Sequence, residues 1–132
     1  TPLPDINDLH RGYDHPIYQV IPYDINEQQE ERILQLMPHC KQTRWHSLAI
    51  DVIPMQGGKQ NGILKVLDYY HIKPEECMAF GDGLNDIEMI QLCQIGVAMG
   101  NAVDELKAQA DIICKPIDKN GLEDILKTLF PE

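Results

Sequence analysis

One short segment of the chain concentrates residue types that can bind a metal ion and a phosphate group. Residues 81–86 read Gly-Asp-Gly-Leu-Asn-Asp and directly follow a short apolar segment, residues 77–80. If residues 77–80 form a strand, the residues after it place two carboxylates and an amide on a tight glycine turn. Ligands of open α/β sheets bind beyond the carboxyl ends of the strands. Mg²⁺ takes one or two carboxylates together with water and phosphate oxygens. The segment therefore predicts a magnesium-bound phosphoryl site, with Asp82 as a metal ligand.

Three further residues fit the same chemistry. Lys59 follows a glycine pair at the start of a predicted helix, so its ammonium and the free helix amides both favour an anion. Asn85 can donate to a phosphate oxygen. Asp86 can either help to hold the metal ion or hold Lys59, and the sequence leaves both roles open.

The elements that must position these residues alternate in type after residue 54. Strands are predicted at residues 78–80, 95–99 and 111–114, and helices at 59–70, 84–92, 101–110 and 122–129, with Asn101 as a helix cap. This alternation predicts an α/β fold, a parallel sheet with helices on both faces.

The first part of the chain has a different character. Residues 1–16 are expected to be a connector. Residues 17–53 are expected to form a strand–helix–strand unit, with strands at 17–21 and 44–53 and a helix that Asn26 caps. The boundary between this unit and residues 54–132 is predicted near residues 53–57.

Several motifs in order resemble those of the haloacid dehalogenase-like phosphohydrolases. Residues 81–86 look like the fourth motif of that family, and residues 58–62 (GKQNG) look like its third, the lysine motif. The segments 95–102, 108–111 and 120–122 resemble the C-terminal segments of the family. The nearest branch is the Cof-type sugar-phosphate phosphatases, and the resemblance covers roughly residues 17–130.

This resemblance implies a reaction and residue roles. In the family, an aspartate nucleophile attacks a phosphomonoester, a second aspartate two residues later acts as acid and base, and Mg²⁺ neutralises the phosphoryl group. By position, Asp82 matches the metal-binding acid, Asp86 its companion carboxylate, Lys59 the catalytic lysine and Asn85 a phosphate contact. The implied substrate is a small phosphorylated metabolite, such as a sugar phosphate. The fold implied is a partial Rossmannoid core, residues 54–132, plus part of an α/β cap, residues 17–53.

The chain departs from the family at the nucleophile. No D-x-D triplet occurs among its 132 residues, and Asp51, the nearest carboxylate in an apolar strand-like run, has no acid two residues on. We therefore expect this chain alone to be inactive, with the missing motif in an N-terminal half of about equal size. The sheet would then have exposed edges that favour self-association or binding of the missing half.

Composition limits the classes of partner. The net charge of −10 argues against nucleic acid and against an anionic membrane surface, and no apolar run is long enough to span a bilayer. Four cysteines without C-x-x-C spacing predict free thiols in a reducing cytoplasm.

Other interpretations stay open at this point. The chain could be a truncated, non-catalytic homologue that acts as a binding or regulatory module. A piece of a P-type ion pump, which has a similar motif, is disfavoured by the lack of a membrane span. Arg44, Trp45 and His46 could line a substrate pocket in the cap, but Trp45 could equally pack between cap elements.

Overall fold

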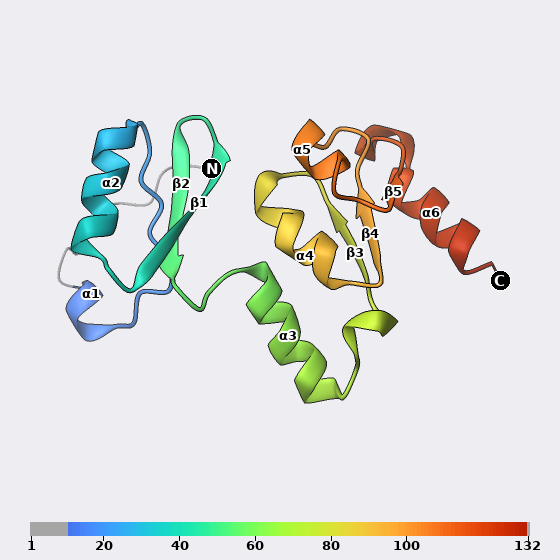
Figure 1. Cartoon of the computed structure of the whole chain (residues 1–132), viewed down its shortest axis with the longest axis horizontal. Coiled ribbons are helices and arrows are strands. Elements are labelled where there is room, and N and C mark those ends of the chain that lie inside the picture. Colours follow the sequence, from blue (N-terminus) through green and yellow to red (C-terminus); the bar gives the residue numbers. More distant parts are fainter. Residues whose placement is uncertain (1–10, 132) are drawn as a thin grey trace.

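The computed structural model describes residues 11–131, in which two small sheets are joined through a helix (Figure 1). The first sheet pairs two strands, and the second pairs three. The strands are β1 (Cys40–His46), β2 (Ala49–Pro54), β3 (Met78–Gly81), β4 (Ile95–Ala98) and β5 (Ile112–Ile113). The α-helices are α1 (Arg11–Asp14), α2 (Glu27–Leu36), α3 (Lys59–Tyr70), α4 (Ile87–Leu92), α5 (Asp104–Lys107) and α6 (Gly121–Leu129). Short 3₁₀ turns are η1 (Pro74–Glu76), η2 (Leu84–Asp86) and η3 (Ile117–Lys119).

The three-stranded sheet is parallel, with the order β3-β4-β5. Its pairing aligns Met78 with Ile95 and Gly81 with Ala98, so β3 and β4 end at the same edge. In Figure 1, α4 and α6 lie to either side of these strands. Helix and strand side chains enclose one buried core: Ala79, Ile90, Val97, Ala98, Met99, Ala102, Leu106 and Cys114. The predicted α/β class with a parallel sheet is confirmed.

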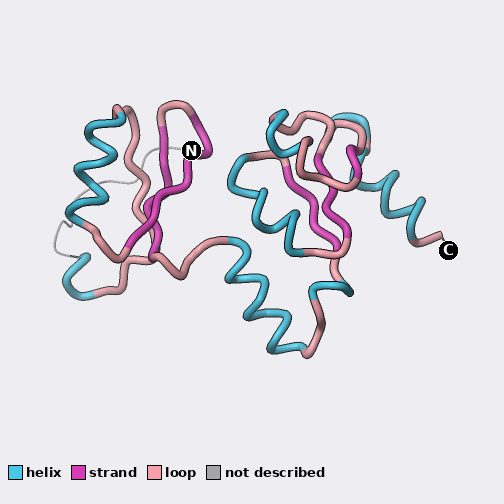
Figure 2. The backbone as a smooth tube through the Cα atoms, viewed as in Figure 1, coloured by secondary structure: helices cyan, strands magenta, loops and turns pink. Residues whose placement is uncertain are grey.

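The strand predicted over residues 44–53 is wrong, because the chain reverses within it. β1 and β2 form an antiparallel hairpin with a turn at Ser47 and Leu48 (Figure 2). The turn contains no glycine, proline, asparagine or aspartate, and Ser47 is only a weak turn signal. The turn is held instead by Arg44, whose Nη1 donates to the carbonyl oxygens of His46 and Ser47 at 3.3 and 3.0 Å, and by the Leu48 N–H, which donates to His46 Nδ1 at 3.2 Å.

The strand predicted over residues 17–21 is also wrong. Within that segment only Val20 forms a bridge, to Val52, and Tyr23 forms another, to Ala49. Proline at position 22 cannot donate to a ladder, which prevents a continuous strand here. The helix that comes next is as predicted, since Asn26 Oδ1 accepts from the Gln29 N–H at 2.9 Å and Gln29 returns the contact.

Two boundaries differ near the end of the core. Asn101 does not cap a helix, because α5 begins at Asp104 after Val103. The Asn101 Oδ1 atom instead accepts from the Ile117 N–H at 3.1 Å, which ties the loop after β4 to η3. The last strand is also shorter than predicted, over Ile112–Ile113 only. Both errors lie in short elements whose ends are set by tertiary contacts.

Part of the predicted connector, residues 1–10, lies outside the described residues. Its remaining residues include the single helical turn α1. None of the helices within residues 11–131 has the length and apolarity that a membrane span requires.

Candidate functional site

The glycine turn after β3 is organised around the carboxylate of Asp86. Its Oδ2 atom accepts from the backbone N–H groups of Asp82 and Gly83, at 3.0 and 3.1 Å. Gly81 is required for this packing, because a Cβ atom there would lie 2.6 Å from the Asp86 Cβ. The turn thus places Asp86 in the protein interior, where its side chain is only 5% exposed.

Lys59 reaches the same carboxylate from the first residue of α3. The helix begins after Gly58, whose φ of +110° is a conformation that side chains other than glycine rarely adopt. From there the Lys59 ammonium forms an ion pair with Asp86 Oδ1, although 47% of the lysine side chain stays exposed. The structure therefore joins Lys59, Asp86 and the glycine turn into one polar cluster.

The contacts of Asp86 determine its charge state. Burial alone would raise the pKa of this carboxyl, but the hydrogen bonds from Lys59 and from the Asp82 and Gly83 amides, with the lysine charge, outweigh it. The pKa of Asp86 is consequently below its usual value of 3.8. Asp86 is therefore a carboxylate at neutral pH and can keep Lys59 oriented.

We expect Asp86→Asn to lower the free energy of unfolding at pH 7 by about 2 kcal/mol, since charge-assisted hydrogen bonds are lost. The pKa of Asp86 is lower in the folded than in the unfolded chain, where it is about 3.9. The stabilisation is therefore complete at pH values above about 3.9 and is lost as the pH falls through the lower pKa of the folded chain. Urea unfolding of both proteins between pH 7 and pH 3 measures this convergence. Asp118→Asn, at an exposed position without a hydrogen bond or ion pair among the described residues, is the control. A wild-type–variant difference that does not shrink with falling pH would contradict the assignment.

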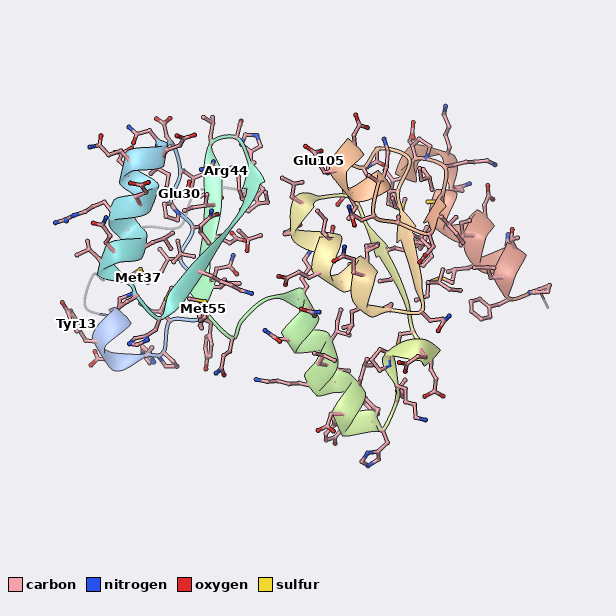
Figure 3. The ribbon with its side chains drawn as sticks, viewed as in Figure 1. Tyr13, Glu30, Met37, Arg44, Met55 and Glu105 are labelled. Atoms are coloured by element: carbon pink, nitrogen blue, oxygen red, sulfur yellow. The ribbon has the colours of Figure 1, made fainter. Side chains whose placement is uncertain are left out.

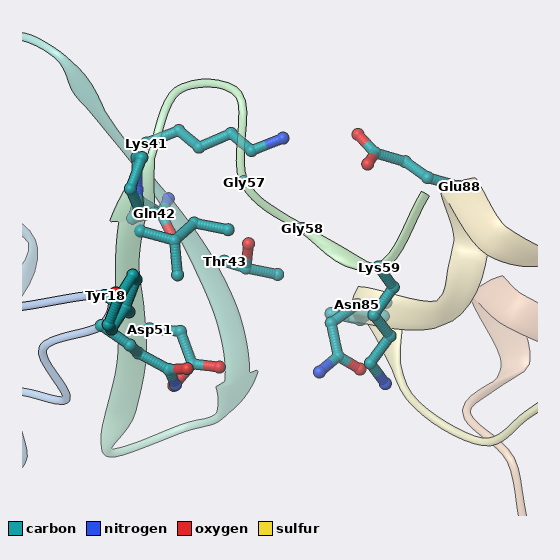
Figure 4. Close-up of a pocket in the computed structure, with 14 residues that line it drawn as sticks. Tyr18, Lys41, Gln42, Thr43, Asp51, Gly57, Gly58, Lys59, Asn85 and Glu88 are labelled. Carbon is teal, nitrogen blue, oxygen red and sulfur yellow. The ribbon is translucent and has the colours of Figure 1, made fainter. Parts of the chain in front are cut away.

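Asp82 and Asn85 differ from Asp86 in being available to a ligand. The Asp82 residue is exposed, and within residues 11–131 its carboxylate makes no hydrogen bond or ion pair. Asn85 and Lys59 both line a cavity of about 580 Å³ (Figure 4). Asp82 does not line this cavity but adjoins it through the turn. The four residues singled out from the sequence thus lie at one edge of the parallel sheet.

The opposite wall of the cavity comes from the β1–β2 hairpin. Lys41, Thr43 and Asp51 line this wall, across the cavity from Lys59 and Asn85, and Lys41 extends toward Glu88 (Figure 4). The sequence reasoning did not assign Lys41 or Thr43 to a site. The signal was present, because the two residues alternate along a strand, but that strand was expected to begin only at residue 44.

The residues proposed for a cap pocket do not line this cavity. Arg44 forms an ion pair with Glu30 of α2, and Figure 3 shows the two side chains between the helix and the hairpin. Trp45 stacks edge-on against Tyr23, with ring centroids 6.4 Å apart, and its Nε1 donates to Asp51 Oδ1 at 2.9 Å. These contacts hold one edge of Trp45, while 43% of the residue stays exposed, so it is only partly packed.

Comparison with known proteins places these features in one family. The family model for haloacid dehalogenase-like hydrolases matches residues 2–126. YkrA of Bacillus subtilis (strain 168) is 41% identical over 130 residues, which cover 98% of this chain and 49% of that protein. The 5-amino-6-(5-phospho-D-ribitylamino)uracil phosphatase YwtE of the same organism is 29% identical over 124 residues, 92% of this chain and 43% of that protein.

Solved structures show the same relationship in three dimensions. The subclass IIB sugar phosphatase BT4131 matches with a TM-score of 0.79 and 38% identity, over 90% of this chain and 45% of that one. BT1666 of Bacteroides thetaiotaomicron matches with a TM-score of 0.83 and 34% identity, over 93% and 46%. The chain spans about half the length of YkrA and of these two solved structures. It belongs to the haloacid dehalogenase-like hydrolases, in the Cof-type branch that includes these phosphatases.

Proposed function

We propose that this chain carries the lysine and metal-binding half of a magnesium-dependent phosphatase site, and that the complete protein hydrolyses small phosphorylated metabolites such as sugar phosphates. One observation carries the proposal. The Lys59–Asp86 ion pair is fixed on the glycine turn at the carboxyl edge of β3, beside the exposed Asp82 carboxylate, which has no polar partner within residues 11–131. A site of this kind can hold a cation and a phosphate together.

The donor set suits magnesium. The exposed Asp82 carboxylate offers hard oxygen ligands, and Asp86 adds the one lone-pair site, on Oδ1, that its lysine and amide contacts leave free. Asp82 and Asp86 would hold the ion. When bound, Mg²⁺ would neutralise negative charge on the phosphoryl group.

The other two residues act on the phosphate. Lys59, which Asp86 holds, is half exposed and lines the cavity, and it would offer its remaining N–H groups to a phosphoryl oxygen. Asn85 on the same cavity wall would donate from its amide group. Lys59 is held by α3 and Asn85 by η2. These two residues would therefore move little while they stabilise negative charge on the phosphoryl group.

The nucleophile is proposed to come from an N-terminal half. β3 pairs only with β4 among the described strands, so its other edge can accept a further strand. The coverage of only 49% of YkrA and 45% of BT4131 by this chain supports such a half. The same edge could serve self-association. The free, partly or fully buried cysteines support the cytoplasm as the compartment.

A non-catalytic role is the second candidate, because the chain contains no D-x-D triplet. The two are separated by measuring orthophosphate release from sugar phosphates, with Mg²⁺ and with EDTA. We expect no turnover by this chain alone, and Mg²⁺-dependent turnover by the protein that joins it to a half with the D-x-D motif. A joined protein that binds sugar phosphates without hydrolysing them would favour the binding role instead.

A further inference from the structure

The cavity-facing side of the hairpin is polar and has free hydrogen-bonding groups. Lys41 pairs with Ile53 across the hairpin, and Thr43 pairs with Asp51, so these four side chains share one face. That face lines the cavity opposite Lys59. Within residues 11–131, neither the Lys41 ammonium nor the Thr43 hydroxyl has a hydrogen-bond partner, whereas Asp51 accepts from Trp45.

Lys41 is unusual among the cations of the chain. Each other half-buried lysine or arginine side chain that the structure describes has a carboxylate partner: Arg44 has Glu30, and Lys107 has Asp104. The described cations without an ion pair, apart from Lys41, are all exposed: Arg32, Lys65, Lys73 and Lys119. A half-buried ammonium without a partner costs free energy, and a bound anion would remove that cost.

Lys41 lies close to the proposed phosphoryl site but on another wall of the cavity. Its Nζ atom lies 3.5 Å from the place that a Cβ atom on Gly58 would occupy, one residue before Lys59. Lys59 is directed to Asp86, whereas Lys41 extends across the cavity toward Glu88 (Figure 4). No ion pair joins Lys41 to Glu88 in the described structure, and Glu88 is exposed. The cavity thus has a second cationic group, the Lys41 ammonium, on the side away from the proposed metal-binding turn.

We propose that Lys41 and Thr43 recognise a second anionic group, a phosphate or a carboxylate, on the part of the substrate that leaves after hydrolysis. This inference rests on the proposed phosphatase site, which would take the first phosphate. The ammonium would pair with the second anion, and the Thr43 hydroxyl would donate to it or to a neighbouring substrate hydroxyl. The preferred substrates are then phosphorylated acids or bisphosphates rather than neutral sugar monophosphates.

The test uses the 132-residue chain itself, labelled with nitrogen-15 and titrated in the presence of Mg²⁺. Three probes differ in the second group: glucose 6-phosphate has none, 6-phosphogluconate has a carboxylate, and glucose 1,6-bisphosphate has a phosphate. All three should shift the amide signals near Gly83 and Asn85. Only the two probes with a second anionic group should also shift those of Lys41 and Thr43, and they should bind about tenfold more tightly.

Lys41→Gln should remove this tenfold preference and leave the affinity for glucose 6-phosphate unchanged. Lys65→Gln, an exposed lysine on α3 outside the cavity, makes the same change in net charge and should leave all three affinities unchanged. Glu88→Gln should tighten binding of the two probes with a second anionic group about twofold, because the facing negative charge is removed. The amide spectrum of each variant reports directly whether it is folded.

Each other outcome has a distinct meaning. Equal binding of the three probes by the wild-type chain would overturn the second-anion site and leave the phosphate site intact. An equal loss for all three in Lys41→Gln would place Lys41 on the shared phosphate, which also overturns the inference. Failure of every probe, and of orthophosphate, to shift the Gly83 and Asn85 signals would contradict the proposed phosphate site itself. Where the expected tenfold preference is found, the affinities for 6-phosphogluconate and glucose 1,6-bisphosphate identify which second anion the site prefers.

Discussion

Replacing Asp82 by alanine should lower kcat/KM for p-nitrophenyl phosphate by about a thousandfold or more in the protein that joins this chain to its nucleophile. The reason is the loss of the exposed carboxylate that is proposed to hold Mg²⁺. The fold should persist, because the Asp82 residue is exposed and its side chain makes no contact with a polar partner in the described part of the chain. Steady-state hydrolysis at saturating Mg²⁺, together with thermal unfolding, measures both effects.

Asp118→Asn supplies the control for this experiment. Asp118 is an exposed carboxylate in η3, away from the cavity, and its replacement should leave activity unchanged. If Asp82→Ala retained Mg²⁺-dependent activity, the metal assignment would be wrong.

Replacing Lys59 by methionine should have the second-largest effect, a fall in kcat of about 10²- to 10³-fold. Methionine keeps the apolar stem but removes the ammonium that contacts both Asp86 and, by proposal, the phosphate. It also removes the cation that lowers the pKa of Asp86, so burial would raise that pKa. When the medium is acidified, the variant should therefore lose its residual activity at a higher pH than that at which the wild-type enzyme loses its activity.

Lys65→Met is the matched control, since it alters an exposed lysine on the same helix. Its activity and pH profile should match those of the unmodified protein. A Lys59→Met enzyme with an unchanged acid limb and unchanged kcat would show that Lys59 is only a structural partner of Asp86.

The parallel core and the grouping of Lys59 with Asp86 could be predicted from sequence patterns that are local and strong. The glycine turn and the amphipathic helix α3 are each specified within a dozen residues, so long-range packing could not change their type. The ion pair between them is one of the two roles that the sequence left open for Asp86. Asp82 as a metal ligand remains a prediction, as does the division of the chain near residues 53–57.

The sequence patterns did not predict that the β1–β2 hairpin forms one wall of the cavity, and the reasons are physical. Its turn at Ser47 and Leu48 has no residue with a special backbone preference and depends on side-chain hydrogen bonds from Arg44. Placing the strand from residue 44 hid the alternation of Lys41 and Thr43, which is visible only once β1 is known to begin at Cys40. The same reasoning failed at Asn101, whose partner Ile117 is distant in sequence.

The most direct test of the central claim is a titration of the labelled chain with Mn²⁺, a paramagnetic substitute for Mg²⁺ that broadens nearby amide signals. The proposed site predicts that signals of residues 81–86 and of Lys59 disappear first, and that Asp82→Ala abolishes this selectivity. Broadening that begins instead at the acidic helices α2 or α6, with residues 81–86 unaffected, would contradict the claim that the turn after β3 is a metal–phosphoryl site.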